Sequence, residues 1–336
     1  MSKILRIQPS HRGERRIATV IASCVLALAV GVSTSGCTGP LADLLSGNPL
    51  RSKTFFVNPF SEAAKAAEAV NEWSSYAATT GFKKLAAQPS GIWLTPEKYS
   101  IRTVHETVSR FVHSAARLKR TPIFVVYGIP NRDCGSESGG GLSRHDYPRW
   151  IANIASAVTN SQAVIILEPD SLALTETCNN EAERLSEIRS GIEAFAKTQA
   201  ILYIDAGHSE WLEPEKISNL LNQAGVQRVQ GFFTNVANYN STSREQRFAE
   251  QVSALTGGSH YVIDTSRNGG GSNGIWCNPE GRKLGQTTLV NSKGGAEDAR
   301  LWIKPPGESD GYCNGGPVAG AWWEARAEQL ILDSNW

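Results

Sequence analysis

The sequence predicts an α/β fold with a parallel β-sheet built from repeated strand–helix units. Short apolar runs rich in β-branched residues recur about every 30 to 40 residues, the spacing of such units. Segments with helical periodicity lie between them. The runs are continuously apolar, which is typical of strands covered on both faces. An open doubly wound sheet and a closed barrel both agree with this pattern, and no GxGxxG motif follows the first predicted strand to indicate a nucleotide crevice.

Seven runs are predicted as strands: 90–94, 122–129, 163–167, 201–204, 231–234, 260–263 and 301–303. The segments predicted as helices are 61–81, 103–118, 145–159, 181–198, 215–224 and 243–255. In the first of these, Ser61 is the expected N-cap and Gly81 the expected end. From Glu308 onward the chain is rich in Gly and Trp, which predicts a long loop before a final helix.

The first 37 residues have the pattern of an export signal. Five basic residues precede an apolar stretch over 17–32, and small residues lead to Cys37. An uncleaved membrane anchor is one alternative. A lipid on Cys37 is another, although Thr34 stands where lipoprotein signals usually have Leu. Residues 38–54 are then a linker and 55–336 a single domain, which we expect to be secreted or attached to the cell surface.

Composition narrows the function. The formal net charge is +1, so no strong field attracts nucleic acid. Nine Trp accompany one Met, a bias that favours carbohydrate binding because an indole face matches a pyranose ring. Cys24 and Cys37 lie in the leader, and the other four Cys predict two disulfides with three possible connectivities. Without CxxC or HxxxH spacing, we expect no metal and no cofactor.

Carboxylates follow the predicted strands at the same point, strand after strand. They are Asp133, Asp170, Asp205, Asp264 and Asp310. A single Asp there could simply cap the next helix. In a barrel, however, all these strand ends meet at one face, where catalytic residues collect. Several carboxylates together with Trp indicate glycoside hydrolysis, which needs one protonated carboxyl and a second group that activates water or attacks.

Five segments in order carry a family resemblance: VVYGIPNRDCG (125–135), VIILEPDSLA (164–173), LYIDAGHSEW (202–211), IDTSRNGGG (263–271) and WIKPPGESDG (302–311). From about residue 56 to the C-terminus, the chain resembles glycoside hydrolase family 6, which contains β-1,4-endoglucanases and cellobiohydrolases. The resemblance implies a distorted, seven-stranded β/α barrel of TIM-like type, with 55–336 as its catalytic domain. It also implies hydrolysis of β-1,4-glucan with inversion.

The resemblance assigns roles to four aspartates. Asp170 matches the general acid, and Asp133 matches the residue that raises the acid's pKa and supports the transition-state charge. Asp205 matches an Asp that hydrogen-bonds near the acid. Asp310 matches the disputed catalytic base, whose function a water relay could replace.

Ten further residues match substrate-binding positions: Trp93, Tyr127, Arg132, Ser138, His208, Trp211, Asn238, Trp276, Lys304 and Glu308. Arg132 would bind the carboxylate network, and Ser138 would help to hold the attacking water. Core packing is the alternative for the Trp residues, and a purely structural role is the alternative for His208. The expected disulfides are Cys134–Cys178 and Cys277–Cys313, because each pair joins loops on the site face and the resemblance implies the same pairs.

Two features favour cutting inside glucan chains. After Trp211 the chain reads Leu-Glu-Pro, where processive members of the family place a second Trp. The segment from Cys277 to Cys313 is also compact, which leaves little length to roof a tunnel. We therefore expect a monomeric endo-β-1,4-glucanase that acts on a polysaccharide. The alternatives are a cellobiohydrolase of the same family and a catalytically weak glucan-binding surface protein.

Overall fold

Seven parallel strands form the centre of the fold. The computed structural model describes residues 47–336. The parallel strands are β1 (Ile92–Leu94), β2 (Ile123–Val126), β3 (Val164–Leu167), β4 (Ile201–Asp205), β5 (Gly231–Thr234), β6 (His260–Asp264) and β8 (Glu297–Leu301). They pair in sequence order, and the two-residue strand β7 (Leu289–Val290) pairs antiparallel with β8. The predicted parallel α/β architecture is confirmed.

The barrel is distorted where its first and last parallel strands face each other. No strand pairing joins β1 to β8. Instead, the Gly91 amide donates a hydrogen bond to the Trp302 carbonyl at 2.9 Å, and Trp93 Nε1 donates to the Ile303 carbonyl at 3.0 Å. A Cβ atom on Gly91 would lie 2.4 Å from the Ile303 oxygen, so only glycine permits this approach. Contacts just beyond the end of β8 thus join the segment around β1 to the last parallel strand.

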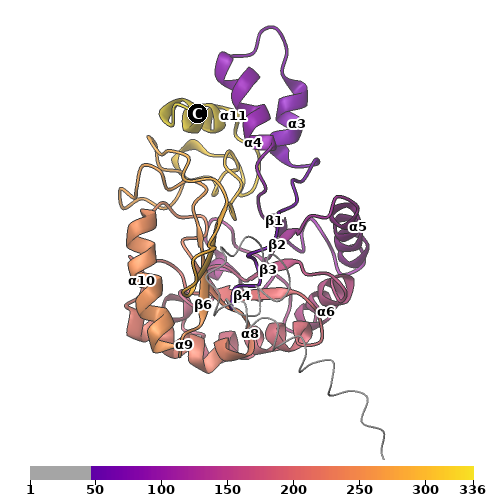
Figure 1. Cartoon of the computed structure of the whole chain (residues 1–336), viewed down its shortest axis with the longest axis vertical. Helices are drawn as coiled ribbons and strands as arrows, with labels where there is room; N and C mark the ends of the chain where they lie inside the picture. Colours follow the sequence, from indigo (N-terminus) through magenta and orange to yellow (C-terminus); the bar gives the residue numbers. More distant parts are fainter. Residues whose placement is uncertain (1–46) are drawn as a thin grey trace, which may run out of the picture. The chain divides into compact units, whose positions relative to one another are not determined.

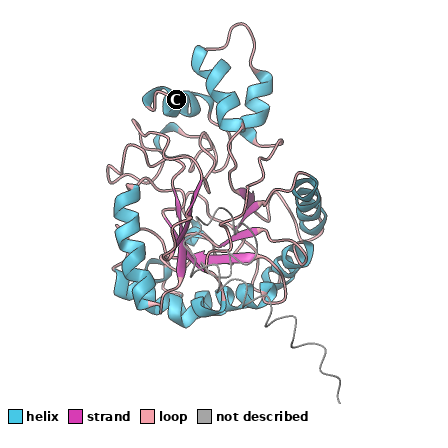
Figure 2. Cartoon of the chain, in the orientation of Figure 1, coloured by secondary structure: helices cyan, strands magenta, loops and turns pink. Residues whose placement is uncertain are grey.

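Five longer helices follow the strands and pack outside them, as Figures 1 and 2 show. They are α5 (Val104–Arg117), α6 (Tyr147–Ala157), α8 (Glu181–Phe195), α9 (Pro214–Ala224) and α10 (Thr242–Leu255). Consecutive members contact each other, with α6 next to α8. All five predicted helices in this region are confirmed to within a few residues. A short helix, α7 (Thr175–Cys178), was not predicted.

The strands bury both faces. In β2, Ile123 and Val125 belong to an inner cluster with the inward residues of the other strands, whereas Phe124 and Val126 pack in the outer cluster against the helices. Every residue of β2 and β3 is buried. This two-sided burial explains why the strand segments are continuously apolar instead of alternating.

The last parallel strand begins earlier than predicted. The strand β8 runs from Glu297 to Leu301, so it shares only Leu301 with the expected strand at 301–303. Its first residues are charged and so did not look like a buried strand. Asp298 is fully buried and bonds His260 at 2.8 Å and Tyr203 at 2.6 Å. Charges neutralised by partners far away in the sequence are indistinguishable from surface charges until the fold is known.

The predicted helix at 61–81 is also interrupted. Ser61 caps α3 (Glu62–Ala69) as expected, but the chain leaves the helix at Val70. It returns through a π-helical turn, η1 (Ala77–Gly81), that runs directly into α4 (Phe82–Ala86). Gly81 therefore does not end a helix; a Cβ there would lie 2.5 Å from Ile331 of the C-terminal helix α11 (Glu324–Asp333). Tight packing, and not a turn, accounts for this glycine.

The folded region starts before the predicted boundary at residue 55. Leu50 is completely buried, and the Asn48 side chain donates to the Asp298 carbonyl at 2.8 Å. Phe55 forms an isolated parallel β-bridge with Thr121. The predicted export signal, the lipid site at Cys37 and most of the linker lie outside the described residues. Within residues 47–336, no helix is long and apolar enough to span a membrane.

Candidate active site

The other three predicted aspartates influence the ionisation of Asp170. Burial raises the pKa of Asp170 well above its usual range, and the carboxylates of Asp205, Asp133 and Asp310 raise it further in that order. Lys304 opposes this effect. The ends of β2, β3, β4 and β8 therefore bring these side chains to one place, as predicted. The arrangement favours a protonated Asp170.

The loops that carry Asp133 and Asp170 have unusual backbone conformations. Asp133, Cys134, Glu168 and Asp170 all have positive φ angles, between 47° and 68°. Such conformations are unfavourable for non-glycine residues and cluster at functional sites. Fully buried Glu168 helps to hold them, because its carboxylate accepts hydrogen bonds from the amides of Gly128 and Ile129 at 3.0 to 3.1 Å. Burial raises the pKa of Glu168 to about 7.

Asp205 organises the backbone that follows the predicted acid. Its carboxylate accepts hydrogen bonds from the amides of Leu172 at 3.0 Å and Ala173 at 3.2 Å. A third bond comes from the amide of Gly207 at 2.9 Å. Burial raises the pKa of Asp205 to about 6. These contacts join the loops after β3 and β4 and fix the position of Asp170.

Asp133, Ser138 and Tyr127 form a chain of hydrogen bonds. Ser138 donates to Asp133 Oδ2 through its hydroxyl at 2.9 Å and its amide at 3.0 Å. The Tyr127 hydroxyl lies 2.8 Å from Ser138 Oγ. Because the Ser138 hydrogen points to Asp133, Tyr127 must be the donor in that second pair. Burial keeps the pKa of Tyr127 well above its ordinary value, so the phenol stays protonated.

Arg132 does not make the predicted contact with the aspartates. Its guanidinium pairs with Glu97 at 3.2 Å and donates to the carbonyls of Tyr127 and Ser138 at 2.8 Å each. It also lies over the Tyr127 ring at 4.6 Å. Only 6% of the residue is exposed, and its donors are occupied by protein groups. Arg132 therefore shapes the loop that carries Ser138, and the sequence could not reveal Glu97 as its partner.

Asp310 is held in the ionised form by two cations. Arg267 approaches its carboxylate at 3.0 and 3.1 Å, and Lys304 Nζ lies 3.8 Å away. Tyr239 and the amide of Asn278 donate to the same carboxylate at 3.1 and 3.0 Å. Burial alone would raise the pKa of Asp310, but Arg267 and Lys304 outweigh it and lower the pKa. The sequence predicted Lys304 but missed Arg267, whose only signal was its place in the IDTSRN segment.

Aromatic and charged side chains predicted to bind sugar gather beside these groups. Trp93 meets the Tyr127 ring edge-on at 5.2 Å, and Lys304 Nζ lies 5.5 Å from the Trp93 ring. Lys304 also donates to the Ser309 carbonyl at 2.9 Å. Burial raises the pKa of Glu308 to about 7 despite the opposing charge of Lys304. Trp93 is partly exposed, so core packing does not account for it fully.

The loops after β4, β5 and β6 carry the other residues that were predicted to bind sugar. The rings of His208 and Trp211 lie 5.2 Å apart. Asn238 is partly buried, and its amide donates to the Val236 carbonyl at 3.1 Å. Trp276 is 51% exposed, far from the burial of a core indole. The side chains of Trp211 and Trp276 are thus both partly accessible to solvent.

Both predicted disulfides are present, Cys134–Cys178 and Cys277–Cys313. The first ties the Asp133 loop to α7, and the second joins the two segments that carry Trp276 and Asp310. Glu137 approaches Cys277 and Cys313 in a group with metal-like spacing. Because both sulfurs are in a disulfide, they are not thiolate ligands. The Glu137 carboxylate instead accepts a hydrogen bond from the Tyr312 amide at 2.7 Å.

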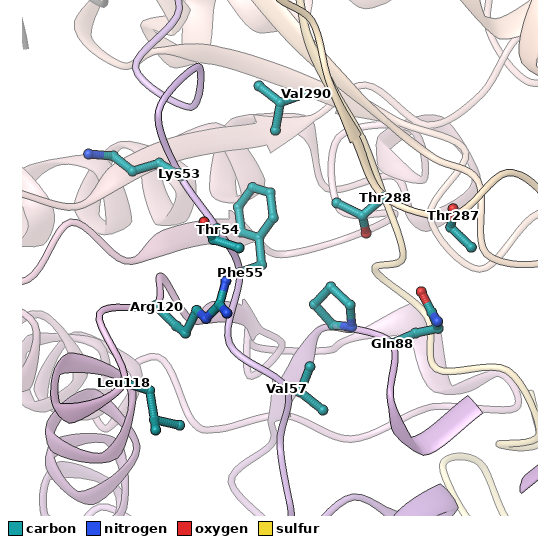
Figure 3. Close-up of a pocket in the computed structure, with 11 residues that line it drawn as sticks. Lys53, Thr54, Phe55, Val57, Gln88, Leu118, Arg120, Thr287, Thr288 and Val290 are labelled. Carbon is teal, nitrogen blue, oxygen red and sulfur yellow. The ribbon is translucent and has the colours of Figure 1, made fainter. Parts of the chain in front are cut away.

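A separate cavity of about 420 Å³ lies beside the segments that precede β1 and β2 (Figure 3). Its lining includes Lys53, Phe55, Gln88, Arg120 and Thr288. None of the predicted site residues contributes to it. The cavity is therefore not part of the aspartate site.

A partly buried carboxyl with a raised pKa, an ionised carboxylate and accessible indoles on a β/α barrel are the features of a glycoside hydrolase. The chain matches the family model "Glycosyl hydrolases family 6" over residues 50–334. It therefore belongs to glycosyl hydrolases family 6. The family and enzyme class expected from the five sequence segments are confirmed.

The relatives of this chain include proteins named endoglucanase and others named exoglucanase. Endoglucanase A of Cellulomonas fimi is 38% identical over 86% of this chain, which spans only 63% of that protein's length. Endoglucanase A of Thermobispora bispora is 37% identical over 92% of this chain and 69% of its own length. A structure of the endoglucanase Cel6 from Mycobacterium tuberculosis has a TM-score of 0.81 and 40% identity, covering 86% of this chain and 100% of that one.

Proposed function

We propose that this protein is an endo-β-1,4-glucanase that hydrolyses internal bonds of a cellulose-type polysaccharide with inversion of the anomeric carbon. One observation carries the proposal. Asp170 is partly buried near three other aspartates and its pKa is raised, while Asp310 in the same site is paired with cations and its pKa is lowered. One carboxyl is thus suited to give a proton and the other to stay charged.

In this mechanism Asp170 donates its proton to the glycosidic oxygen as the bond from that oxygen to the anomeric carbon breaks. A water molecule attacks the anomeric carbon from the opposite face and loses a proton. Asp133 stabilises the positive charge that develops on the sugar, and Asp205 holds the backbone beyond Asp170. Trp93, Trp211 and Trp276 are proposed to stack on sugar rings.

The group that receives the water's proton is either Asp310 itself or a relay that leads to solvent. Direct transfer agrees with the ionised state of Asp310. A relay agrees with its strong pairing to Arg267, which lowers the basicity of the carboxylate. The hydroxyls of Ser138 and Tyr127 provide hydrogen-bonding groups for such a relay.

Three observations support the endo mode over a cellobiohydrolase. Four relatives named endoglucanase are 33 to 39% identical to this chain, whereas the probable exoglucanase GH6D of Podospora anserina is 29% identical. Leu212, and not a second Trp, follows Trp211. Half of Trp276 is open to solvent. A cellobiohydrolase remains the second candidate, since a Chaetomium thermophilum cellobiohydrolase core has a TM-score of 0.75 and 26% identity.

Comparing viscosity with released reducing ends on a soluble β-1,4-glucan distinguishes the two modes. An endo enzyme should remove most of the viscosity while few reducing ends have formed, because each internal cut halves a chain on average. A cellobiohydrolase would release sugar with little early change in viscosity. Release of no reducing ends would instead favour the weak glucan-binding protein.

We also infer that the protein works outside the cytoplasm as a monomer. The two disulfides support an oxidising compartment. The leader expected in residues 1–37 supports export, either by secretion or with attachment to the cell surface. A polymeric substrate too large to enter a cell agrees with this location.

A further inference from the structure

The protonation state of His208 is set by its neighbours. Its Nδ1 atom lies 3.0 Å from the Asn240 side-chain amide and 3.2 Å from the backbone amide of Glu210, and both groups donate. A ring nitrogen that accepts two hydrogen bonds carries no proton. In the neutral ring the proton is therefore on Nε2, which makes no hydrogen bond within residues 47–336.

The orientation of Asn240 decides whether this geometry holds. The Asn240 Nδ2 atom also donates to Glu245 Oε1 at 3.1 Å. If the amide were flipped, its oxygen would face both a carboxylate oxygen and Nδ1. Glu245 thus selects the orientation that presents N–H to His208.

Glu245 is well placed for this function. It lies in the first turn of α10, is completely buried, and accepts a second hydrogen bond from the Ser209 amide at 3.0 Å. The Asn240 backbone is fixed as well. Its amide donates to Asn235 Oδ1 at 3.1 Å, and its carbonyl accepts from Asn235 and Asn268 at 3.1 and 3.0 Å. Neither residue can turn away without breaking several buried hydrogen bonds.

The surroundings of His208 also keep it uncharged. Burial and, to a smaller extent, the charge of Arg244 lower the pKa of His208 to about 4. Arg244 itself pairs with Glu210. The facing charged groups are therefore Glu210 on its own loop and Arg244 and Glu245 on α10. At neutral pH the imidazole is a neutral donor through Nε2, beside the Trp211 ring.

We propose that Asn240 and Glu245 are positioning residues that hold His208 as the Nε2–H tautomer, so that it donates a hydrogen bond to a hydroxyl of the sugar stacked on Trp211. The sugar contact rests on the proposed function, but the tautomer does not. Neither Asn240 nor Glu245 was singled out from the sequence.

Nitrogen NMR of protein labelled with ¹⁵N-histidine reads the tautomer directly. In the wild-type protein without substrate, His208 should show an unprotonated Nδ1 and a protonated Nε2 at neutral pH, assigned by comparison with His208→Gln. An unprotonated Nε2 or a charged ring at that pH would overturn the proposal, whatever the activity.

Asn240→Asp supplies the functional test. An Asp carboxylate accepts a hydrogen bond from Nδ1–H, so it should invert the tautomer and raise the pKa of His208. Below the raised pKa, the charged ring still donates through Nε2. Above it, that donor is lost. The KM of the variant for a soluble β-1,4-glucan should therefore rise about fivefold with increasing pH, the loss of one neutral hydrogen bond, while the wild-type KM stays level over that range.

Glu245 offers a matched pair of variants. Glu245→Gln keeps an oxygen that accepts from Asn240, so the NMR signature and the KM should stay close to wild type. Glu245→Met removes the acceptor and should give a mixture of His208 tautomers with a higher KM. Equal behaviour of the two, or a pH-independent KM in Asn240→Asp, would contradict the positioning role. If the NMR result is as expected but no glucan is hydrolysed, the proposed function fails and the tautomer assignment stands.

Discussion

Replacement of Asp170 by Asn should lower hydrolysis of an unactivated β-1,4-glucan by about a thousandfold, within the range usual for loss of a general acid. Asn has nearly the same shape but cannot supply a proton to the leaving oxygen. A substrate with a strongly acidic leaving group, such as a dinitrophenyl cellobioside, needs less protonation and should lose much less activity. Equal losses on both substrates would mean that Asp170 is not the acid.

The same variant should fold normally and be at least as stable as the wild type at neutral pH. The pKa of Asp170 is raised in the folded protein, so its contribution to stability is present at low pH and declines as pH rises above the unfolded value toward the folded one. Asn removes this decline. Urea unfolding at two pH values checks the expectation and separates loss of chemistry from loss of structure.

Replacement of Asp310 by Ala should also reduce activity by a factor of about a hundred or more. This loss is expected whether Asp310 accepts the proton of the water directly or acts with a relay that leads to solvent. Added azide, a small anion that fits the vacated space, then distinguishes the two. Restored activity supports direct proton acceptance by Asp310. Absence of rescue in a folded protein that still binds sugar supports the relay past Ser138.

This second variant carries a structural cost that must be measured alongside. Without Asp310, the buried Arg267 and Lys304 lose their counter-ion, and breaking such a buried pair typically costs about 3 to 5 kcal/mol. Thermal unfolding of Asp310→Asn, which keeps the shape and neutral hydrogen bonding, provides the matched control. Activity should be compared only at temperatures where both variants are folded.

The sequence predicted most of the strands and the four site aspartates, because both have local signals. Buried parallel strands are continuously apolar, and their ends are followed directly by the functional side chains, as for Asp170 after β3. The disulfides also followed from the loops in which their cysteines lie. The signals for the strands and the aspartates depend on residues that are close together in the chain. The disulfides join cysteines 44 and 36 residues apart, and they were predicted from the face on which their loops lie and from the family resemblance.

Features that depend on distant partners were not predictable. Arg132 pairs with Glu97 and Arg267 with Asp310, across 35 and 43 residues respectively. The charged start of β8 is buried because Asp298 meets His260 and Tyr203. Nor does the sequence separate catalytic from structural acids. Asp264 also follows a strand, but its carboxylate accepts the amides of Ile303 and Lys304 and joins β6 to the end of β8.

Proton NMR of the first product tests the central claim most directly. A soluble β-1,4-gluco-oligosaccharide would be mixed with the enzyme in the spectrometer and followed before the product equilibrates. If Asp170 protonates the leaving oxygen while water attacks from the opposite face, the new reducing end must appear first as the α-anomer. Appearance of the β-anomer first would contradict the inverting mechanism and the proposed roles of Asp170 and Asp310.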